Sequence, residues 1–256
     1  MSTKVEMVMT CVGRSSFLRE TLPINLPKVD NIIVITTPTD YETHRVCAKN
    51  KVTCIETDLF YKHGAPFDKG RALNEGLKKL VHNDWVLLAD CDIILLPAHK
   101  TFFRDKNLDK DFLYGCRRII LENRSKYLDF IKKIAFNIED MNLKDEINDE
   151  PKEIGVGFFQ YFNLKGKHIK EIINQEIFLD DNTFEQVIMP EVNDRNYPRS
   201  LKEKGDLHPY FPTAGGSDSQ FRHFFAEKKA LAATAVPIIH LGKIGSGHSG
   251  SSRNFE

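Results

Sequence analysis

A short apolar run that ends in two carboxylates limits the folds open to this chain. Residues 85–89 read Trp-Val-Leu-Leu-Ala and are followed by Asp90, Cys91 and Asp92. A run this short, apolar at every position and bounded by polar residues, is typical of a strand buried on both faces in a parallel sheet. Because ligands of such sheets gather at the carboxyl ends of the strands, we expect the two carboxylates at the ligand-binding edge.

Carboxylate oxygens are hard ligands that suit Mg²⁺ or Mn²⁺, and a divalent ion held there can also bind the diphosphate of a nucleotide. The pattern Asp-x-Asp is also common by chance, and acids at strand ends often cap the next turn. Cys91 is expected to be a small buried filler rather than a nucleophile, and its position places it among the nucleotide-binding residues.

The first part of the chain alternates strand patterns with helix patterns. Strands are predicted over 5–12, 32–36 and 52–56, and helices over 15–22, from 41 to about 49 and over 69–81. Pro23 is expected to close the first helix, and apolar residues at 73, 77, 80 and 81 give the third an apolar face. Such alternation predicts an α/β fold with a mostly parallel central sheet flanked by helices.

Composition excludes some classes of protein. The chain has 256 residues, of which 41% are hydrophobic, enough for a sizeable core and a soluble globular protein. Lys plus Arg equals Asp plus Glu at 36 each, so no overall field recruits nucleic acid or an anionic membrane, although local patches remain possible.

The chain is expected to stay in the cytoplasm. It contains no apolar run of about 18 residues, and residues 1–10 lack a basic segment followed by an apolar core. Its five cysteines are an odd number with no Cys-x-x-Cys pair, which favours reduced thiols over a disulfide framework or a zinc site.

The middle of the chain has two neighbouring blocks of opposite charge. Residues 117–133 hold six basic and two acidic side chains, and residues 139–153 hold seven acidic and two basic ones. They predict two solvated, mutually attracting helical segments, or alternatively a basic block that guides a phosphate-bearing acceptor. Residues 155–162 predict an aromatic strand, which is either a core strand or a platform for a sugar.

Two later residues are candidates for chemistry. Ser217 to Gln220 fits a capping box, which would place Asp218 at the first helical position, where the helix dipole alone favours an acid. Alternatively, Asp218 takes a proton from an acceptor hydroxyl. His240 ends an apolar strand, where it is either a core residue or a ligand that completes an Asp/His set for Mn²⁺.

Residues 243–256 form a tail rich in glycine and serine. The tail is either disordered or closes over a bound nucleotide, with its main-chain N–H groups and Arg253 on the phosphates.

Taken in order, these motifs resemble a GT-A glycosyltransferase of the family-two type. The landmarks are a loop ending at Asp40, the stretch Lys69-Gly-Arg-Ala-Leu-Asn74-Glu-Gly, Asp90-Cys-Asp92, Gly215-Gly-Ser-Asp218 and His240-Leu-Gly. The resemblance implies a Rossmann-like GT-A fold with a smaller acceptor-side subregion. It also implies transfer of a sugar from a nucleoside-diphosphate sugar, with UDP the expected nucleotide, to an acceptor hydroxyl.

The same resemblance implies roles for residues. Thr10, Val12 and Arg14 would lie near the base and ribose, and Asp40 would contact either of these. Lys69 or Arg71 would approach the diphosphate, while Asn74 supports the loop. Asp92 would ligate Mn²⁺ (or Mg²⁺) directly, Asp90 would contact the ribose or the metal through water, and His240 would be the third ligand. Asp218 matches the residue that serves as base in inverting members.

Departures from the family pattern leave alternatives open. The loop 36–40 holds one acid in place of the usual pair, so the identity of the nucleobase is left open. The motif that carries the catalytic base is reduced to Gly-Ser-Asp218. A retaining reaction is also open. The acceptor is a glycan, a lipid-linked sugar or, if the gene is viral, a hydroxymethylated DNA base, which the balanced net charge does not favour.

We expect one catalytic domain over 1–256, divided into a nucleotide-sugar half (1–97), an acceptor-side half (98–242) and a flexible tail (243–256). A nucleotidyltransferase is one rival, but its glycine-rich loop after the first strand is reduced here to a single glycine, Gly13. An inactive nucleotide-sugar-binding module is the second rival, and a soluble α/β domain with coincidental motifs is the third.

Overall fold

The computed structural model describes residues 3–136, 159–178, 181, 184–188, 192 and 197–242. The acidic block 139–153, the first residues of the predicted strand 155–162 and the tail with Arg253 lie outside these residues. Within them, no helix is both long and apolar enough to cross a membrane.

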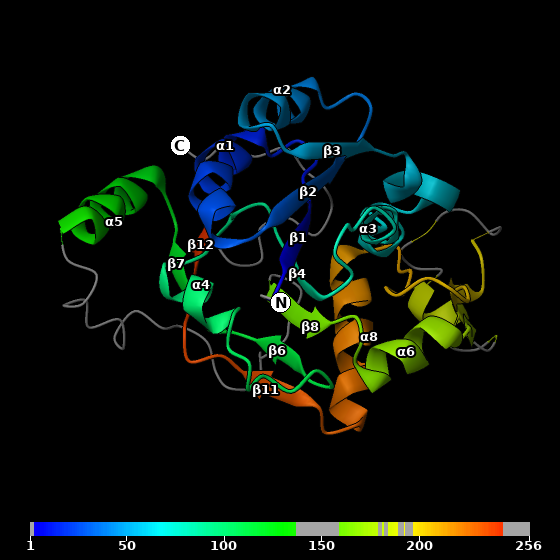
Figure 1. Ribbon diagram of the computed structural model, residues 1–256. Helices are drawn as coiled ribbons and strands as arrows, with labels where there is room; N and C mark the ends of the chain where they lie inside the picture. The colour runs from blue at the N-terminus through cyan, green and yellow to red at the C-terminus, as the bar shows by residue number, and fades with distance from the viewer. Residues whose placement is uncertain are drawn as a thin grey trace.

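A seven-stranded sheet forms the centre of the fold, in the order β11-β6-β8-β4-β1-β2-β3 (Figure 1). Strands β1, β2, β3 and β4 are parallel, β8 is antiparallel to β4 and β6, and β11 is parallel to β6. The predicted α/β class with a mostly parallel sheet is therefore confirmed. The strands are β1 Val5–Thr10, β2 Asn31–Thr36, β3 Thr53–Glu56, β4 Trp85–Ala89, β6 Leu113–Gly115, β8 Phe159–Asn163 and β11 Leu231–Ala233.

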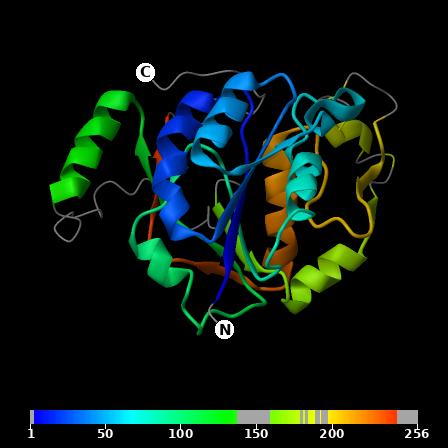
Figure 2. The same ribbon diagram turned by 45° about the horizontal axis from the view of Figure 1, so that its top comes forward.

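Helices cover both faces of this sheet. The helices are α1 Ser15–Asn25, α2 Tyr41–Asn50, α3 Lys69–Leu77, α4 Ala98–Phe102, α5 Arg124–Phe136, α6 Lys167–Asn174 and α8 Ala214–Glu227. Figures 1 and 2 show α1 and α2 on one side of the sheet and α3 and α8 on the other. Shorter helical turns span Leu26–Lys28, Leu59–Gly64 and Phe184–Ile188.

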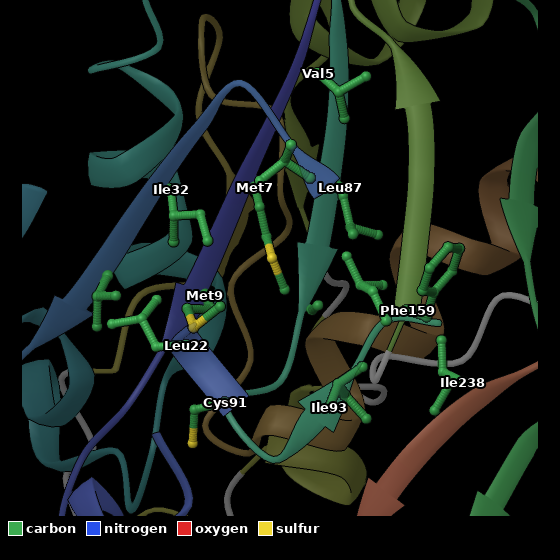
Figure 3. Packing of buried hydrophobic residues seen from close by; sticks show 14 of the residues in the cluster. Val5, Met7, Met9, Leu22, Ile32, Leu87, Cys91, Ile93, Phe159 and Ile238 are labelled. Atoms are coloured by element: carbon green, nitrogen blue, oxygen red, sulfur yellow. The ribbon is translucent and has the colours of Figure 1, made fainter. Parts of the chain in front are cut away.

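The strands at the centre of the sheet are buried on both faces, so their residues divide between two cores. Met7 and Met9 of β1 pack with Leu87 of β4 in the core on the α1 side, whereas Val8 and Leu88 belong to the core on the α3 side. Figure 3 shows the first core, in which Phe159 of β8 completes the packing. This two-sided burial explains why the run 85–89 is apolar throughout.

A smaller three-stranded sheet brings the end of the described chain to the end of β4. It consists of β5 (Ile93–Ile94), β12 (Ile238–Leu241) and β7 (Arg118–Leu121), with β12 between the other two. His240 pairs with Ile93, and the Leu241 N–H donates to the Asp92 carbonyl at 2.9 Å. Strands β9 (Ile177–Phe178) and β10 (Ser200–Lys202) pair antiparallel in a separate two-stranded sheet.

Two helix ends differ from the prediction. Pro23 does not close α1, because the helix continues past it to Asn25. Helix α3 ends at Leu77 rather than 81, since the Val81 and His82 N–H groups donate to the buried Glu6 carboxylate instead of continuing the helix. Val81 is therefore exposed and not part of the apolar face.

The predicted start of α8 is also wrong. The helix begins at Ala214 with Thr213 as N-cap, which places Asp218 in the second turn and not at the first position. Gly216 packs so closely on Phe211 that an added Cβ would lie 2.3 Å from the ring, so glycine lets the helix begin earlier. The capping box at Ser217 is therefore not formed, and its hydroxyl is buried inside the fold.

The aromatic strand is a core strand. Phe159, Tyr161 and Phe162 of β8 are all fully buried, so these side chains are not a platform for a sugar. The basic block is only partly helical, because its first residues form β7 before α5 begins. Its proposed contact with a phosphate-bearing acceptor stays a prediction, as do the domain boundaries.

Candidate active site

The candidate site lies where the parallel strands end. Strands β1, β2 and β4 are parallel neighbours, so the loops that follow Thr10, Thr36 and Ala89 meet at one edge of the sheet. These loops carry Arg14, Asp40 and the pair Asp90 and Asp92. Helix α3 adds Lys69 at its first position, α8 adds Asp218, and β12 adds His240.

Lys69 lies at the centre of this group. Its ammonium donates to Asp90 Oδ1 at 2.7 Å and to Asp218 Oδ2 at 3.0 Å, which joins residues 149 positions apart in the chain. Lys69 is only 3% exposed. Burial alone lowers the pKa of an ammonium, but the charges of Asp218 and Asp90 outweigh it and raise the pKa of Lys69. Lys69 is therefore a fixed buried cation between two of the predicted site carboxylates.

Asp92 forms a second group beside the first. Its Oδ2 accepts from Arg14 Nη1 at 3.4 Å, and its Oδ1 lies 3.7 Å from His240 Nε2. Burial raises the pKa of Asp92 and the neighbouring Asp90 charge raises it further, while His240 and Arg14 act in the opposite direction. A buried carboxylate beside a second, partly exposed one favours the binding of additional positive charge.

The predicted metal ligands are only partly assembled. Among the described residues, no group of three or more His, Cys, Asp or Glu side chains is arranged to hold a metal ion. Asp90 is turned toward Lys69, whereas Asp92 and His240 face one another. In this part of the chain, Asp92 Oδ1 is buried and accepts no hydrogen bond. A carboxylate oxygen and an imidazole nitrogen are donors that suit Mn²⁺.

Asp40 acts in the structure as a helix cap and a loop brace. Its Oδ1 accepts from the Thr43 N–H at the start of α2, and its Oδ2 accepts from the Gly13 N–H at 2.7 Å. Gly13 has a φ of +63°, which other residues rarely adopt. Asp40 thus fixes the loop that carries Arg14, and its contact with base or ribose stays a prediction.

Arg71 is held away from solvent by two neighbours. Its Nε lies 2.9 Å from Asp68 Oδ2, and its guanidinium stacks 3.8 Å from the centre of the Tyr210 ring. The Asp68 carboxylate also caps α3 by accepting from the Arg71 N–H. Of the two basic residues expected at the diphosphate, Lys69 therefore contacts the site carboxylates, whereas Arg71 braces the base of α3.

Asn74 binds the backbone of the segment that leads into α8. Its Oδ1 accepts from the Leu207 and His208 N–H groups, and its Nδ2 donates to the His208 carbonyl at 2.8 Å. These three bonds fix the segment that leads into α8. The segment carries His208, whose Nε2 lies 3.6 Å from Asp218 Oδ1 and which the sequence analysis did not single out. No local pattern marks His208, because its partners lie on α3 and α8.

The other predicted residues lie around this centre. Thr10 is buried at the end of β1, and Val12 packs against the core on the α3 side. Cys91 is buried as expected, and its carbonyl accepts from Thr21 Oγ1 at 2.7 Å. A hydrogen bond to Cys11 and burial raise the pKa of the Cys91 thiol, which argues against a nucleophile.

No protein-family model and no curated protein matches this chain. Its structure is similar to that of glucosyl-3-phosphoglycerate synthase from Mycobacterium tuberculosis in complex with Mn²⁺, UDP and glucosyl-3-phosphoglycerate. The identity is 10%, over 94% of this chain and 73% of that chain, and the TM-score is 0.48.

A second similar structure is 4-diphosphocytidyl-2C-methyl-D-erythritol synthase from Anaerococcus prevotii. The identity is 13%, over 97% of this chain and 91% of that chain, with a TM-score of 0.45. Both TM-scores are below 0.5, so neither similarity assigns a function to this chain. Its fold and site define an α/β protein with acidic and basic side chains gathered at the carboxyl edge of the sheet.

Proposed function

We propose that this chain is a metal-dependent glycosyltransferase, which moves a sugar from a nucleoside-diphosphate sugar to an acceptor hydroxyl. One observation carries the proposal: buried Lys69 joins Asp90, at the end of β4, to Asp218 on α8. A fixed cation between carboxylates at the edge of a parallel sheet suits a reaction in which negative charge develops on a leaving diphosphate.

Lys69 and Arg14 neutralise the leaving group. As the bond between the anomeric carbon and the diphosphate oxygen breaks, its electron pair goes to the β-phosphate. Lys69 is already charged and buried, so it need not reorganise when that charge develops. Arg14, whose side chain is 19% exposed, offers further donors from the loop after β1.

Asp92 and His240 would hold the divalent ion, and Asp90 would contact it through water or bind the ribose. Such an ion supplies a Lewis acid for the diphosphate. The fit rests on the Asp92 Oδ1 atom, which is buried without a hydrogen bond from the described residues and faces the His240 imidazole.

Asp218 acts as the base. It takes the proton of the acceptor hydroxyl while the acceptor oxygen forms its bond to the anomeric carbon. A single displacement of this kind inverts the configuration at that carbon. Asp218 is 6% exposed, so it lies in a nearly water-free part of the site.

The test is release of a nucleoside diphosphate from a panel of nucleotide sugars, with Mn²⁺ or with a chelator, since transferases slowly pass the sugar to water. We expect release from one donor, with UDP-sugars tested first, and only with metal. Release of pyrophosphate on supplying a nucleoside triphosphate and a sugar phosphate would identify a nucleotidyltransferase instead. Donor binding without turnover would identify a binding module.

Two substitutions on the same strand make a matched control. Asp84 precedes β4 and Asp92 follows it, so they lie at opposite ends of one strand. Asp92→Asn should abolish metal-dependent release, whereas Asp84→Asn should leave it unchanged, because Asp84 pairs with Lys165 at the far edge of the sheet. Equal loss in both variants would contradict the assigned site.

A further inference from the structure

His208 is buried beside the carboxylate that we assign as the base. It is 0% exposed and belongs to the segment that leads into α8. The three hydrogen bonds of Asn74 fix the backbone at this position, so the imidazole enters the site from a rigid support. Asn74 lies on the same helix as Lys69. The bonds of Asn74 therefore fix the position of His208 relative to Lys69, and both residues lie beside Asp218.

The imidazole ring has a defined orientation. It stacks on Phe221 with ring centres 5.0 Å apart and an angle of 23° between the planes. Its Nδ1 lies 3.3 Å from the Pro209 carbonyl oxygen, and its Nε2 lies 3.6 Å from Asp218 Oδ1. Within the described part of the chain, this buried Nε2 has no hydrogen-bond partner at normal distance. A small movement of either group would close the gap to Asp218.

The ring is neutral at physiological pH. Burial and, to a lesser extent, the nearby Lys69 charge lower the pKa of His208 to about 3. A neutral imidazole carries one proton, on Nδ1 or on Nε2. A carboxylate is a stronger acceptor than a peptide carbonyl. The Asp218 charge therefore favours the tautomer with the proton on Nε2 over the tautomer with the proton on Nδ1, beside the Pro209 carbonyl.

We propose that His208 is a positioning residue, which donates a hydrogen bond from Nε2 to Asp218 Oδ1 and so directs the other oxygen, Oδ2, toward the acceptor. This inference rests on the proposed function, since it assigns a role relative to the base. Lys69 contacts Oδ2 and His208 faces Oδ1, so each oxygen of the carboxylate has its own neighbour. Lys69 from α3 and His208 from its segment face the Asp218 carboxylate, and Gln160 from β8 donates to the Asp218 main-chain carbonyl at 3.3 Å.

The geometry matters because the reaction needs one oxygen at hydrogen-bond distance from the acceptor hydroxyl. Lys69 restrains the Asp218 carboxylate at Oδ2 through a hydrogen bond of 3.0 Å. A second hydrogen bond at Oδ1 restricts rotation about the Cβ–Cγ bond further, and misplacement of a catalytic group by about 1 Å can cost a hundredfold in rate.

The first experiment does not depend on turnover. Nitrogen NMR of protein labelled at histidine reports which ring nitrogen carries the proton, and the His208→Asn spectrum assigns the His208 signals. We expect the proton on Nε2 in the wild type and on Nδ1 in Asp218→Ala, where Pro209 is the remaining acceptor. A wild-type proton on Nδ1 would overturn the inference, even if Asp218→Ala did not fold.

The second experiment uses two variants that differ in reach. Asn places its amide near the position of Nδ1 and cannot reach Asp218, whereas Gln places its amide near Nε2. Loss of a hydrogen bond to a charged group corresponds to about a ten- to hundredfold fall in rate. We therefore expect His208→Asn to lower kcat by that factor with KM for the donor unchanged. His208→Gln should restore kcat to within about threefold of the wild type, as one comparable hydrogen bond returns.

His99 provides the matched control. It is also 0% exposed, burial lowers its pKa to about 3, and its Nδ1 accepts from the Leu96 N–H at 3.1 Å. It lies on α4 and is not among the proposed site residues. His99→Asn should lower the melting temperature and leave the kcat of the folded protein unchanged.

The outcomes separate the inference from the proposed function. Unchanged kcat in His208→Asn, or no recovery in His208→Gln, would leave His208 a structural residue and overturn the inference while the glycosyltransferase stands. A wild type that turns over no donor would overturn the proposed function together with the positioning role. The NMR result would then still decide whether the hydrogen bond to Asp218 exists.

Discussion

At the scale of single residues, Asp218 and Asp92 have different surroundings, so substituting each of them should affect activity in a different way. Asp218→Asn keeps the size of the side chain and removes its ability to take a proton. General-base assistance contributes about 10²- to 10⁴-fold, so we expect kcat to fall by that factor with donor affinity retained. Initial rates and calorimetric titration with the donor measure the two quantities. Loss of donor binding in parallel with kcat would contradict the role of base.

Asp68 should make the free energy of unfolding fall as the pH rises, which is the opposite of the usual effect of a carboxylate. Burial raises its pKa from 3.8 to about 6, despite the Arg71 contacts that lower it. Between these values the folded protein holds the proton that the unfolded chain has lost. The free energy of unfolding therefore falls as pH rises from about 4 to 6 and then levels off, by as much as about 3 kcal/mol.

Denaturant titrations of the wild type and Asp68→Asn between pH 4 and 7 measure this effect. As the pH rises, Asp68→Asn should become more stable relative to the wild type. Asp111 is the control, because the Lys167 N–H and ammonium lower its pKa, so its contribution is present at neutral pH and lost in acid. The difference in the free energy of unfolding between Asp111→Asn and the wild type should stay flat between pH 4 and 7, because the contribution of a carboxyl with a lowered pKa is lost only below about pH 4. Parallel curves for all three proteins would contradict the raised pKa of Asp68.

The sequence predicted which residues meet at the site. It predicted less well which contacts each of them makes there. Asp90, Asp92, Asp218 and His240 were expected together, and the structure places them at one edge of the sheet. It also pairs Arg71 with Asp68, while His208 approaches Asp218 through contacts with a helix more than 130 positions away. Such contacts leave no periodic signal in the sequence.

At the scale of elements, local patterns predicted β4, α2 and β12 well, because their burial and capping depend on residues that are adjacent in the sequence. Asp40 caps α2 at the predicted start, and β4 matches the apolar run. The start of α8 was not predicted, since it depends on Gly216 packing against Phe211. The end of α3 depends on Glu6, which lies on a different element and captures two N–H groups.

The contact between α3 and the segment before α8 should be sensitive to a single methyl group. A Cβ at Gly70 would lie 1.9 Å from the Pro209 carbonyl oxygen, which is backbone and cannot turn aside. We expect Gly70→Ala to lower the free energy of unfolding by about 1–3 kcal/mol. Because Pro209 adjoins His208, the activity of the folded protein should fall as well.

Gly76→Ala is the control on the same helix. Its Cβ would meet the side-chain methyl groups Ile35 Cδ1 at 2.6 Å and Val8 Cγ1 at 2.7 Å, which are able to shift. The better helix propensity of alanine, about 1 kcal/mol, offsets part of that cost. Denaturant titration should therefore find Gly70→Ala the less stable variant. The reverse order would show that the Pro209 segment yields more easily than the core.

At the scale of the whole molecule, the site links the two halves of the chain. Asp90 and Asp92 follow β4, whereas Asp218 and His240 come from α8 and β12, and Lys69 and the β5–β12 pairing join these parts. A ligand that contacts both parts binds the folded chain and not the unfolded one. Ligand binding should therefore stabilise the molecule as a whole rather than one element.

Thermal unfolding should then depend on metal and nucleoside diphosphate together. A ligand at about 100 times its Kd adds roughly 2.7 kcal/mol, and for a chain of this size each kcal/mol raises Tm by about 2–4 °C. We expect a rise of roughly 5–10 °C with UDP plus Mn²⁺, and a smaller one with UDP alone, because the Asp90 and Asp92 carboxylates oppose an uncompensated diphosphate. Asp92→Asn should lose the increment that depends on metal, while Asp84→Asn keeps it. An equal rise with and without Mn²⁺ would place the diphosphate on Lys69 and Arg14 alone, and Asp92 and His240 would then have no metal to hold.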